Sequence, residues 1–379
     1  MPLRALIVSY VFPPTGGAGV GRVLKLAKYL PAYGVTPSVL TVANPSVPVT
    51  DRSLEKDVAP DLEIVRARTF EPGYALKQAT WSSSSGEGKA NGAGKARNGS
   101  RGLPRRALGR VVALGKQALV PDPQVLWQPD VHRVLASRLL HGKDDVVFIS
   151  APPFSSFLSA PMVRMSGKAV VLDYRDEWST LRTTYEMLAG KVTARLGEAM
   201  EVGLIRCAHA ITTATEAFRQ NLLDRFPFLE PSRVVAIPNG YDADDFPSAL
   251  PSPPADRFVV TYAGTIFKLT SPRGLLGAVR KLHAREPALA KLLQVRFLGR
   301  IVETELDAFE GTEALGVTRE GYVDKDRVIP ELSASHLVLC LLDDVHGADR
   351  IYPAKIFELM HLGRPCLTLA PQGALTELV

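Results

Sequence analysis

The sequence predicts an α/β protein made of two doubly wound domains that face each other across a cleft. The chain has 379 residues, more than one core of ~150–250 residues holds. Apolar runs of strand length alternate with helical patterns along most of the chain, which is typical of parallel sheets with helices on both faces. A proline-rich stretch between the halves predicts a stiff linker at 249–256, with the first domain at 1–248 and the second at 257–379.

In the first domain, six apolar runs predict strands, and helical patterns separate most of them. The first strand, "LRALIVSY", leads into a glycine-rich loop and the helix "VGRVLKLAKYLPAYG". Further helices are expected from Phe154, up to about Arg206 and after residue 214. The predicted strands are residues 3–10, 36–43, 145–150, 168–174, 208–214 and 233–240.

The same alternation resumes after the linker. Helices are expected from Pro272, near Glu303, from Val328 and from Pro353. Ligands of such a protein bind at the carboxyl ends of the strands. The predicted strands are residues 258–264, 293–299, 317–323, 336–342 and 365–370.

The composition indicates a soluble globular protein of the reducing cytosol. No stretch approaches the ~18–20 apolar residues of a membrane span, and the N-terminus lacks a signal-peptide cleavage site. Three scattered cysteines fit neither a disulfide framework nor a metal site. Residues 81–102 are rich in Ser, Gly and Lys, and they predict a disordered insertion.

Positive charge is concentrated in one part of the first domain. Eight basic residues and no acidic one lie between Lys89 and Lys116, which indicates either an anionic partner surface or a solvated linker. Within it, 103–119 has apolar residues at helical spacing with Arg and Lys between them. This pattern suits a helix in an anionic membrane interface and equally an ordinary packing helix.

The loop "YVFPPTGGAGVGR" (10–22) raises the possibility of a dinucleotide site. That fingerprint requires G-x-G-x-x-G and an acidic residue about 20 residues later. Here Arg22 stands in the third glycine position, and the second strand ends at Asn44 without a carboxylate. The sequence therefore argues against a nicotinamide dehydrogenase. It leaves a flexible loop that approaches a ligand, with Gly16 and Gly17 nearest, or a loop that merely adopts unusual dihedral angles.

Several stretches in order along nearly the whole chain resemble the retaining glycosyltransferases of the GT-B fold, and specifically those of family 4 that make bacterial surface polysaccharides. The fold implied is two Rossmann-like domains. Enzymes of this kind usually end with further elements and a helix that returns to the first domain, so the C-terminal part is expected to be incomplete at "GALTELV". The stretches are 9–34, 121–127, 149–157, 171–178, 234–246, 259–279 and 352–367.

The resemblance implies a donor site for a nucleotide-diphosphate sugar in the second domain. Lys355 lies in the first turn of a helix that begins near Pro353, where a helix attracts a diphosphate. Glu358 would accept hydrogen bonds from the ribose, although an ordinary i,i+3 pair with Lys355 is the alternative.

A second loop, "YAGTIFKLTSPRG", would lie against the donor phosphate. The backbone at Gly264 and Thr265 would approach it closely, and Lys268 or, preferably, Arg273 would offset the charge of the leaving diphosphate. Each of these cations is otherwise a surface charge.

The segment "DYRDEW" (173–178) ends a predicted strand, where a carboxylate would orient or deprotonate an acceptor hydroxyl. We select Asp176 for this role and Arg175 as an acceptor or phosphate contact. The alternative is a helix-capping acid beside a core tryptophan.

The sequence departs from the family at two positions. Phe157 stands where many relatives have a histidine, and Arg350 stands where many have an acidic residue. Either Asp349 takes that acidic role or Arg350 contacts the donor phosphates. The acidic run "DADD" (242–245) follows "PNG" and is interpreted as turn chemistry, and the resemblance implies an enzyme that needs no metal.

We therefore expect a metal-independent, cofactor-free glycosyltransferase of the cytoplasm, peripheral on the inner face of the membrane if the basic segment binds lipid. Its partners would be a nucleotide sugar and a carbohydrate or lipid-linked acceptor, without nucleic acid. The alternatives are a nucleotide-sugar epimerase of the same fold and a non-catalytic, membrane-associated scaffold.

Overall fold

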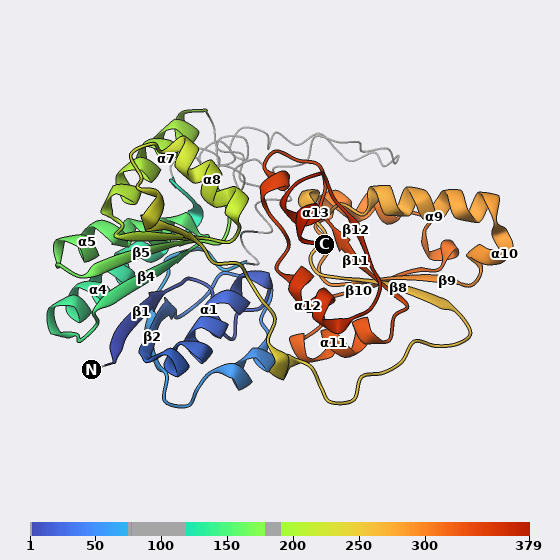
Figure 1. Cartoon of the computed structure of the whole chain (residues 1–379), viewed down its shortest axis with the longest axis horizontal. Helices are drawn as coiled ribbons and strands as arrows, with labels where there is room; N and C mark the ends of the chain where they lie inside the picture. The colour runs from blue at the N-terminus through green and yellow to red at the C-terminus, as the bar shows by residue number, and fades with distance from the viewer. Residues whose placement is uncertain (1, 75–76, 78–118, 179–190) are drawn as a thin grey trace, which may run out of the picture.

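The chain folds into two parallel-sheet α/β domains joined by an extended connection, residues 237–257, which we call the crossover (Figure 1). The computed structural model describes residues 2–74, 77, 119–178 and 191–379. The insertion predicted at 81–102 and nearly all of the basic segment 103–119 lie outside the described residues. The fold class predicted from the alternating pattern is confirmed.

The first domain is built on a seven-stranded sheet in the order β3-β2-β1-β4-β5-β6-β7. All neighbouring strands are parallel. β1 lies between β2 and β4, so the strand order reverses direction at its carboxyl end, where doubly wound sheets bind ligands. The strands are β1 (Leu3–Val8), β2 (Val35–Val42), β3 (Glu63–Ala67), β4 (Val146–Ala151), β5 (Ala169–Tyr174), β6 (Ala210–Thr213) and β7 (Val234–Ala236).

Helices cover both faces of this sheet and bury its apolar side chains. The helix expected from Phe154 begins instead as a 3-10 helix over Phe154–Ser159 and becomes α-helical only at Ala160. The helices are α1 (Ala18–Tyr29), α4 (Gln128–His141), α5 (Ala160–Met165), α7 (Lys191–Cys207) and α8 (Glu216–Arg225).

The second domain repeats the scheme with five parallel strands in the order β10-β9-β8-β11-β12. β8 occupies the reversal point here, as β1 does in the first domain. The helix expected near Glu303 is a 3-10 helix over Glu303–Phe309. The strands are β8 (Phe258–Ala263), β9 (Leu293–Leu298), β10 (Val317–Glu320), β11 (Leu337–Leu341) and β12 (Cys366–Leu369), and the helices are α9 (Arg273–Arg285), α10 (Pro287–Ala290), α11 (Lys325–Ser333), α12 (Lys355–Leu362) and α13 (Ala374–Leu378).

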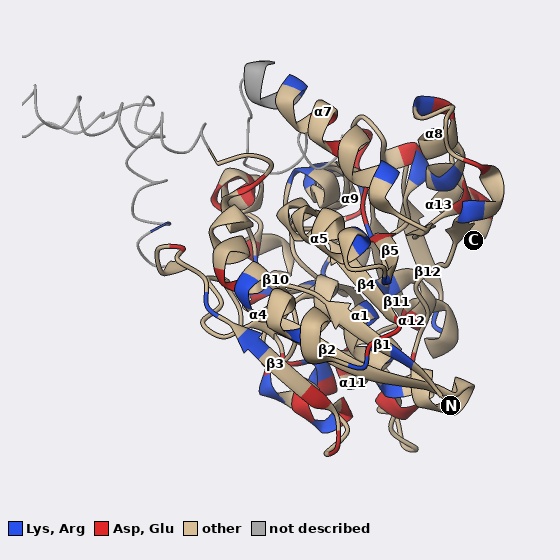
Figure 2. Cartoon of the chain, turned by 90° about the vertical axis from the view of Figure 1, so that its left-hand side faces the viewer, with Lys and Arg blue, Asp and Glu red and all other residues tan. Residues whose placement is uncertain are grey.

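Charged residues of both signs are interspersed over the face of the first domain that Figure 2 shows. The whole chain carries a formal net charge of +6. None of the described helices combines the length and the apolar character that a membrane crossing requires.

Candidate functional site

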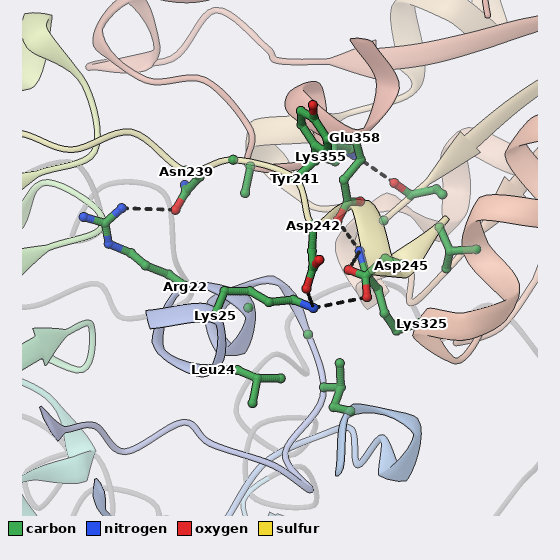
Figure 3. A pocket seen from close by; sticks show the side chains of 18 of the residues that line it. Arg22, Leu24, Lys25, Asn239, Tyr241, Asp242, Asp245, Lys325, Lys355 and Glu358 are labelled. Atoms are coloured by element: carbon green, nitrogen blue, oxygen red, sulfur yellow. Dashed lines mark hydrogen bonds and ion pairs between the residues drawn. The ribbon is translucent and has the colours of Figure 1, made fainter. Parts of the chain in front are cut away.

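A cavity of about 480 Å³ lies between the two domains. The first domain contributes one face of α1 over residues 21–29, and the crossover contributes residues 237–242 and Asp245. The second domain contributes the segments that follow β8, β9 and β10 and the first turn of α12. Because these segments follow strands of both sheets, the cavity lies where the fold predicts a ligand (Figure 3).

The glycine loop after β1 is closed by the second domain. Gly17 lines the cavity and has a φ of 99°, which a residue with a side chain rarely adopts. A Cβ atom on Gly16 would lie 2.9 Å from the Tyr322 hydroxyl and 2.8 Å from Val49. Gly16 therefore permits close packing of the loop against both domains and does not itself line the cavity.

Arg22, in the third glycine position of the rejected dinucleotide fingerprint, forms a buried ion pair with Asp173 at the end of β5. The closest nitrogen–oxygen distance is 2.8 Å, and Ser150 and Thr212 each donate a further hydrogen bond of 2.7 Å to the same carboxylate. Arg22 also donates to the carbonyl of Ile237 on the crossover at 2.7 Å. This side chain thus joins α1, the centre of the sheet and the crossover.

Arg175 and Asp176 lie directly after β5 but do not line the cavity. The Arg175 guanidinium donates hydrogen bonds to the carbonyls of Gly19 and Pro152, so it links the glycine loop after β1 to the segment after β4. Burial raises the pKa of Asp176; the charge of Arg175 opposes this rise, and those of Glu177 and Asp173 add to it. A carboxylate with a raised pKa takes up a proton more readily than an ordinary aspartate does.

On the donor side, Lys355 lies at the reversal point of the second sheet. Its ammonium donates to the carbonyl of Ala263 at 3.1 Å and lies 3.6 Å from the centroid of the Tyr262 ring. A Cβ atom on Gly264 would come within 2.7 Å of this ammonium, and Gly264 has a φ of 145°. Gly264, Thr265 and Lys355 all line the cavity, as the donor prediction requires.

Glu358 also lines the cavity, one turn after Lys355. Its carboxylate forms an ion pair with Lys325 at the start of α11. The Lys325 ammonium also lies 3.9 Å from a carboxylate oxygen of Asp245 (Figure 3). The i,i+3 pair with Lys355 that we considered as an alternative is replaced by this longer-range pair.

The other predicted donor residues lie outside the cavity lining, and their donor role stays a prediction. Lys268 is exposed, and Arg273 at the start of α9 pairs with Asp307 at 2.5 Å. Asp349 is exposed, and Pro353 precedes α12.

Arg350 connects the two domains. Its guanidinium forms two parallel bonds to the carboxylate of Glu177, at 2.6 and 2.7 Å, and Glu177 is fully buried. Thr215 of the first domain donates to the Arg350 carbonyl at 2.5 Å. At the position where the resemblance led us to expect an acidic residue, this chain has a cation that binds an acidic residue of the other domain.

The acidic run on the crossover is paired with lysines of α1. Asp242 caps the 3-10 turn Ala243–Asp245, as turn chemistry predicts, and accepts hydrogen bonds from Lys25, Lys28 and Tyr29. Asp57, Asp242 and Asp245 are close enough to hold a metal ion, but Lys25 bonds to all three carboxylates.

The crossover also contacts α12 through aromatic rings. Tyr241 stacks on His361 with 3.9 Å between centroids, and Phe246 meets the same ring edge-on at 4.5 Å.

A further contact between the domains is centred on Asp51, which the sequence did not single out. Asp51 accepts hydrogen bonds from the Tyr322 hydroxyl at 2.8 Å and from the Lys325 amide at 3.0 Å. The Lys325 amide is the first of α11, so a carboxylate of one domain caps a helix of the other. Burial would raise the pKa of Asp51, but hydrogen bonds from Ser53, Tyr322 and Lys325 hold it below its usual range.

Arg300 was missed as well. It is the second residue after β9 and lines the cavity. The run "RFLGR" ends a predicted strand with a glycine and a cation, and this signal could have identified Arg300, as "YAGT" identified Gly264.

No protein-family model matches the chain, and no curated protein matches it in sequence. Solved structures match it in fold. Sucrose-phosphate synthase from Thermosynechococcus elongatus aligns with a TM-score of 0.63 at 14% identity, and the match covers 100% of this chain and 83% of that one. The HepE protein of Anabaena in complex with UDP and glucose aligns with a TM-score of 0.59 at 16% identity, and the match again covers 100% of this chain and 83% of that one. WaaG, a glycosyltransferase involved in lipopolysaccharide biosynthesis, aligns at 0.55 and 13%, with 99% and 83% coverage. The chain therefore has the GT-B fold.

Proposed function

We propose that this protein is a retaining, metal-independent glycosyltransferase. It moves a sugar from a nucleotide-diphosphate sugar to an acceptor hydroxyl in the synthesis of a bacterial polysaccharide or glycolipid. Family 4 membership and retention come from the sequence resemblance. The matched structures of this fold include a glycosyltransferase of lipopolysaccharide biosynthesis and a protein in complex with UDP and glucose, which supports the reaction class.

The observation that carries the proposal is the position of Lys355. Its ammonium lies at the carboxyl end of β8 and lines the cavity, in the space that the missing side chain of Gly264 leaves for it. Such a cation offsets the negative charge that a nucleoside diphosphate gains as the sugar leaves. Glu358, one turn later, would accept hydrogen bonds from the ribose hydroxyls. Its ion pair with Lys325 would then be weakened, because the same carboxylate would be shared between Lys325 and the ligand.

In the reaction, the bond from the sugar to the diphosphate breaks and a bond to the acceptor oxygen forms. The acceptor proton must leave, and from the sequence motif we assign it to Asp176, which follows β5 outside the cavity lining and would have to be reached by the acceptor there. Arg175 supports the glycine loop above it through the Gly19 carbonyl. Binding to an anionic membrane and a cytoplasmic location are part of the proposal on the sequence alone.

The test measures release of the nucleoside diphosphate from UDP-, GDP- and ADP-sugars without an acceptor, a slow side reaction of a bound donor. We expect Lys355→Ala and Glu358→Ala to abolish it. Lys291→Ala is the matched control, because Lys291 is exposed at the end of α10 and away from the cavity. Normal release by Lys355→Ala and Glu358→Ala would contradict the donor site. Isomerisation of the donor sugar would indicate an epimerase, and the absence of any turnover would favour a scaffold.

A further inference from the structure

The cations that line the interdomain cavity differ in how their charge is compensated. Arg22 pairs with Asp173, and Lys25 pairs with three carboxylates around the crossover. Lys325 pairs with Glu358 (Figure 3). These three positive charges are already neutralised by neighbours.

Arg300 and Lys355 are the two lining cations that have no carboxylate partner among the described residues. Lys355 binds a carbonyl and the face of a tyrosine ring. Arg300 donates through Nη1 to the hydroxyl of Tyr74 in the first domain, at 3.1 Å. A guanidinium has five N–H donors in a planar fork, so this bond leaves Arg300 able to bind an anion as well.

The backbone places the segment that carries Arg300 beside the segment that the Lys355 ammonium contacts. Ala263 and Leu298 are paired at the ends of β8 and β9, so Gly264 and Gly299 follow side by side. A Cβ atom on Gly299 would collide with the Gly264 carbonyl, and Gly299 has a φ of 133°. Ile266 donates to the Arg300 carbonyl at 2.8 Å, which fixes the segment that carries Arg300 to the one after β8.

We propose that Arg300 binds the diphosphate of the donor together with Lys355, one cation reaching it from each side of the paired glycines. This inference rests on the proposed function. Two uncompensated cations suit a ligand with at least two negative charges, and a guanidinium binds phosphate oxygens in pairs. Arg300 would thereby offset the charge of the leaving diphosphate, the role that we predicted from the sequence for Lys268 or Arg273. Neither of those two residues lines the cavity.

Calorimetric titration tests this. UDP, GDP and ADP are titrated into the full chain, and the tightest binder is then titrated into the variants. We expect Arg300→Ala to weaken its binding about 10- to 100-fold, the value of charge-assisted hydrogen bonds to a phosphate. Arg300→Lys should recover part of the loss, and the corresponding nucleoside, which lacks phosphates, should bind wild type and Arg300→Ala alike. Arg285→Ala, an exposed arginine in the last turn of α9, is the matched control.

The outcomes separate this inference from the proposed function. If wild type binds none of the three diphosphates, the proposed function fails and Arg300 has no donor to bind. If wild type binds one and Arg300→Ala binds it equally well, only the role of Arg300 is overturned. Tyr74→Phe removes the contact with the first domain and keeps the guanidinium. Weakening by Tyr74→Phe equal to that by Arg300→Ala would show that Arg300 acts through domain packing, which also overturns it.

Discussion

The contact centred on Asp51 predicts that this carboxylate contributes measurably to closure of the cleft, alongside the pair between Arg350 and Glu177. Asp51→Ala removes the hydrogen bonds from the Tyr322 hydroxyl and the Lys325 amide. A hydrogen bond to a charged group contributes about 1.5–3 kcal/mol. Two bonds at the lower value give about 3 kcal/mol, which corresponds to a change of about 150-fold in the ratio of closed to open molecules.

Small-angle X-ray scattering measures this change, because an open cleft increases the radius of gyration. We expect Asp51→Ala to be more extended than wild type at neutral pH. Asp51 also caps its own 3-10 turn, with Ser53 donating to it from both its amide and its hydroxyl. Ser53→Ala therefore separates the local loop from the domain contact, and the exposed Asp61→Ala controls for the loss of one charge.

The pKa of Asp51 is lowered in the closed form, so its contribution is present above the ordinary pKa of an aspartate, about 3.9, and is lost as the pH falls through the lowered value. Closure should consequently be insensitive to pH between about 5 and 8. Equal radii of gyration for Asp51→Ala and wild type would refute the reasoning, as would an equal expansion in Ser53→Ala.

Two further predictions concern one residue of each domain and its surroundings. Asp122 accepts a hydrogen bond from the Ser155 amide, and burial, with the charge of Glu71, raises the pKa of Asp122 to about 6. Because the folded state holds this proton more tightly than the unfolded state, the free energy of unfolding should fall by about 3 kcal/mol as the pH rises from about 4 to 6. Asp122→Asn should remove this fall, as measured by urea titrations at several pH values. An unchanged pH profile in Asp122→Asn would count against the prediction. In the second domain, Gly264→Ala should weaken diphosphate binding at least about tenfold and lower the melting temperature, because its φ of 145° strains a side chain and its Cβ displaces the Lys355 ammonium. Gly277→Ala, inside α9 with open space around its Cβ, should instead raise the melting temperature, and the same direction of change in both variants would contradict this account.

Much of the fold could be predicted because apolar periodicity is a local signal. The strands β1, β2 and β4 each contain consecutive apolar residues, most of which are buried, so the sequence alone identifies them. β3 was missed because its five residues are "EIVRA", in which only Ala67 is buried. The strand lies at the edge of the sheet, where polar side chains reach solvent.

The candidate site was less predictable, because its geometry depends on residues far apart in the chain. Gly264 followed a recognisable strand end and Lys355 a recognisable helix start, and both line the cavity. Nothing local shows that Arg22 pairs with Asp173, which is 151 residues away. Asp51 likewise reaches a helix 274 residues later. Ion pairs of this kind follow from how the two domains are placed, and composition and spacing do not encode that placement.

The crossover is fastened to both domains within a few residues. Tyr241 rests on the His361 ring of α12, while its neighbour Asp242 is bonded to the lysines of α1. A wide hinge opening of one domain away from the other would have to break either the contact of Tyr241 with His361 or the bonds of Asp242 to the lysines. A rotation about an axis close to the crossover would disturb both least. Any change in the angle between the two domains must therefore occur around residues 241–242 or break one of these contacts.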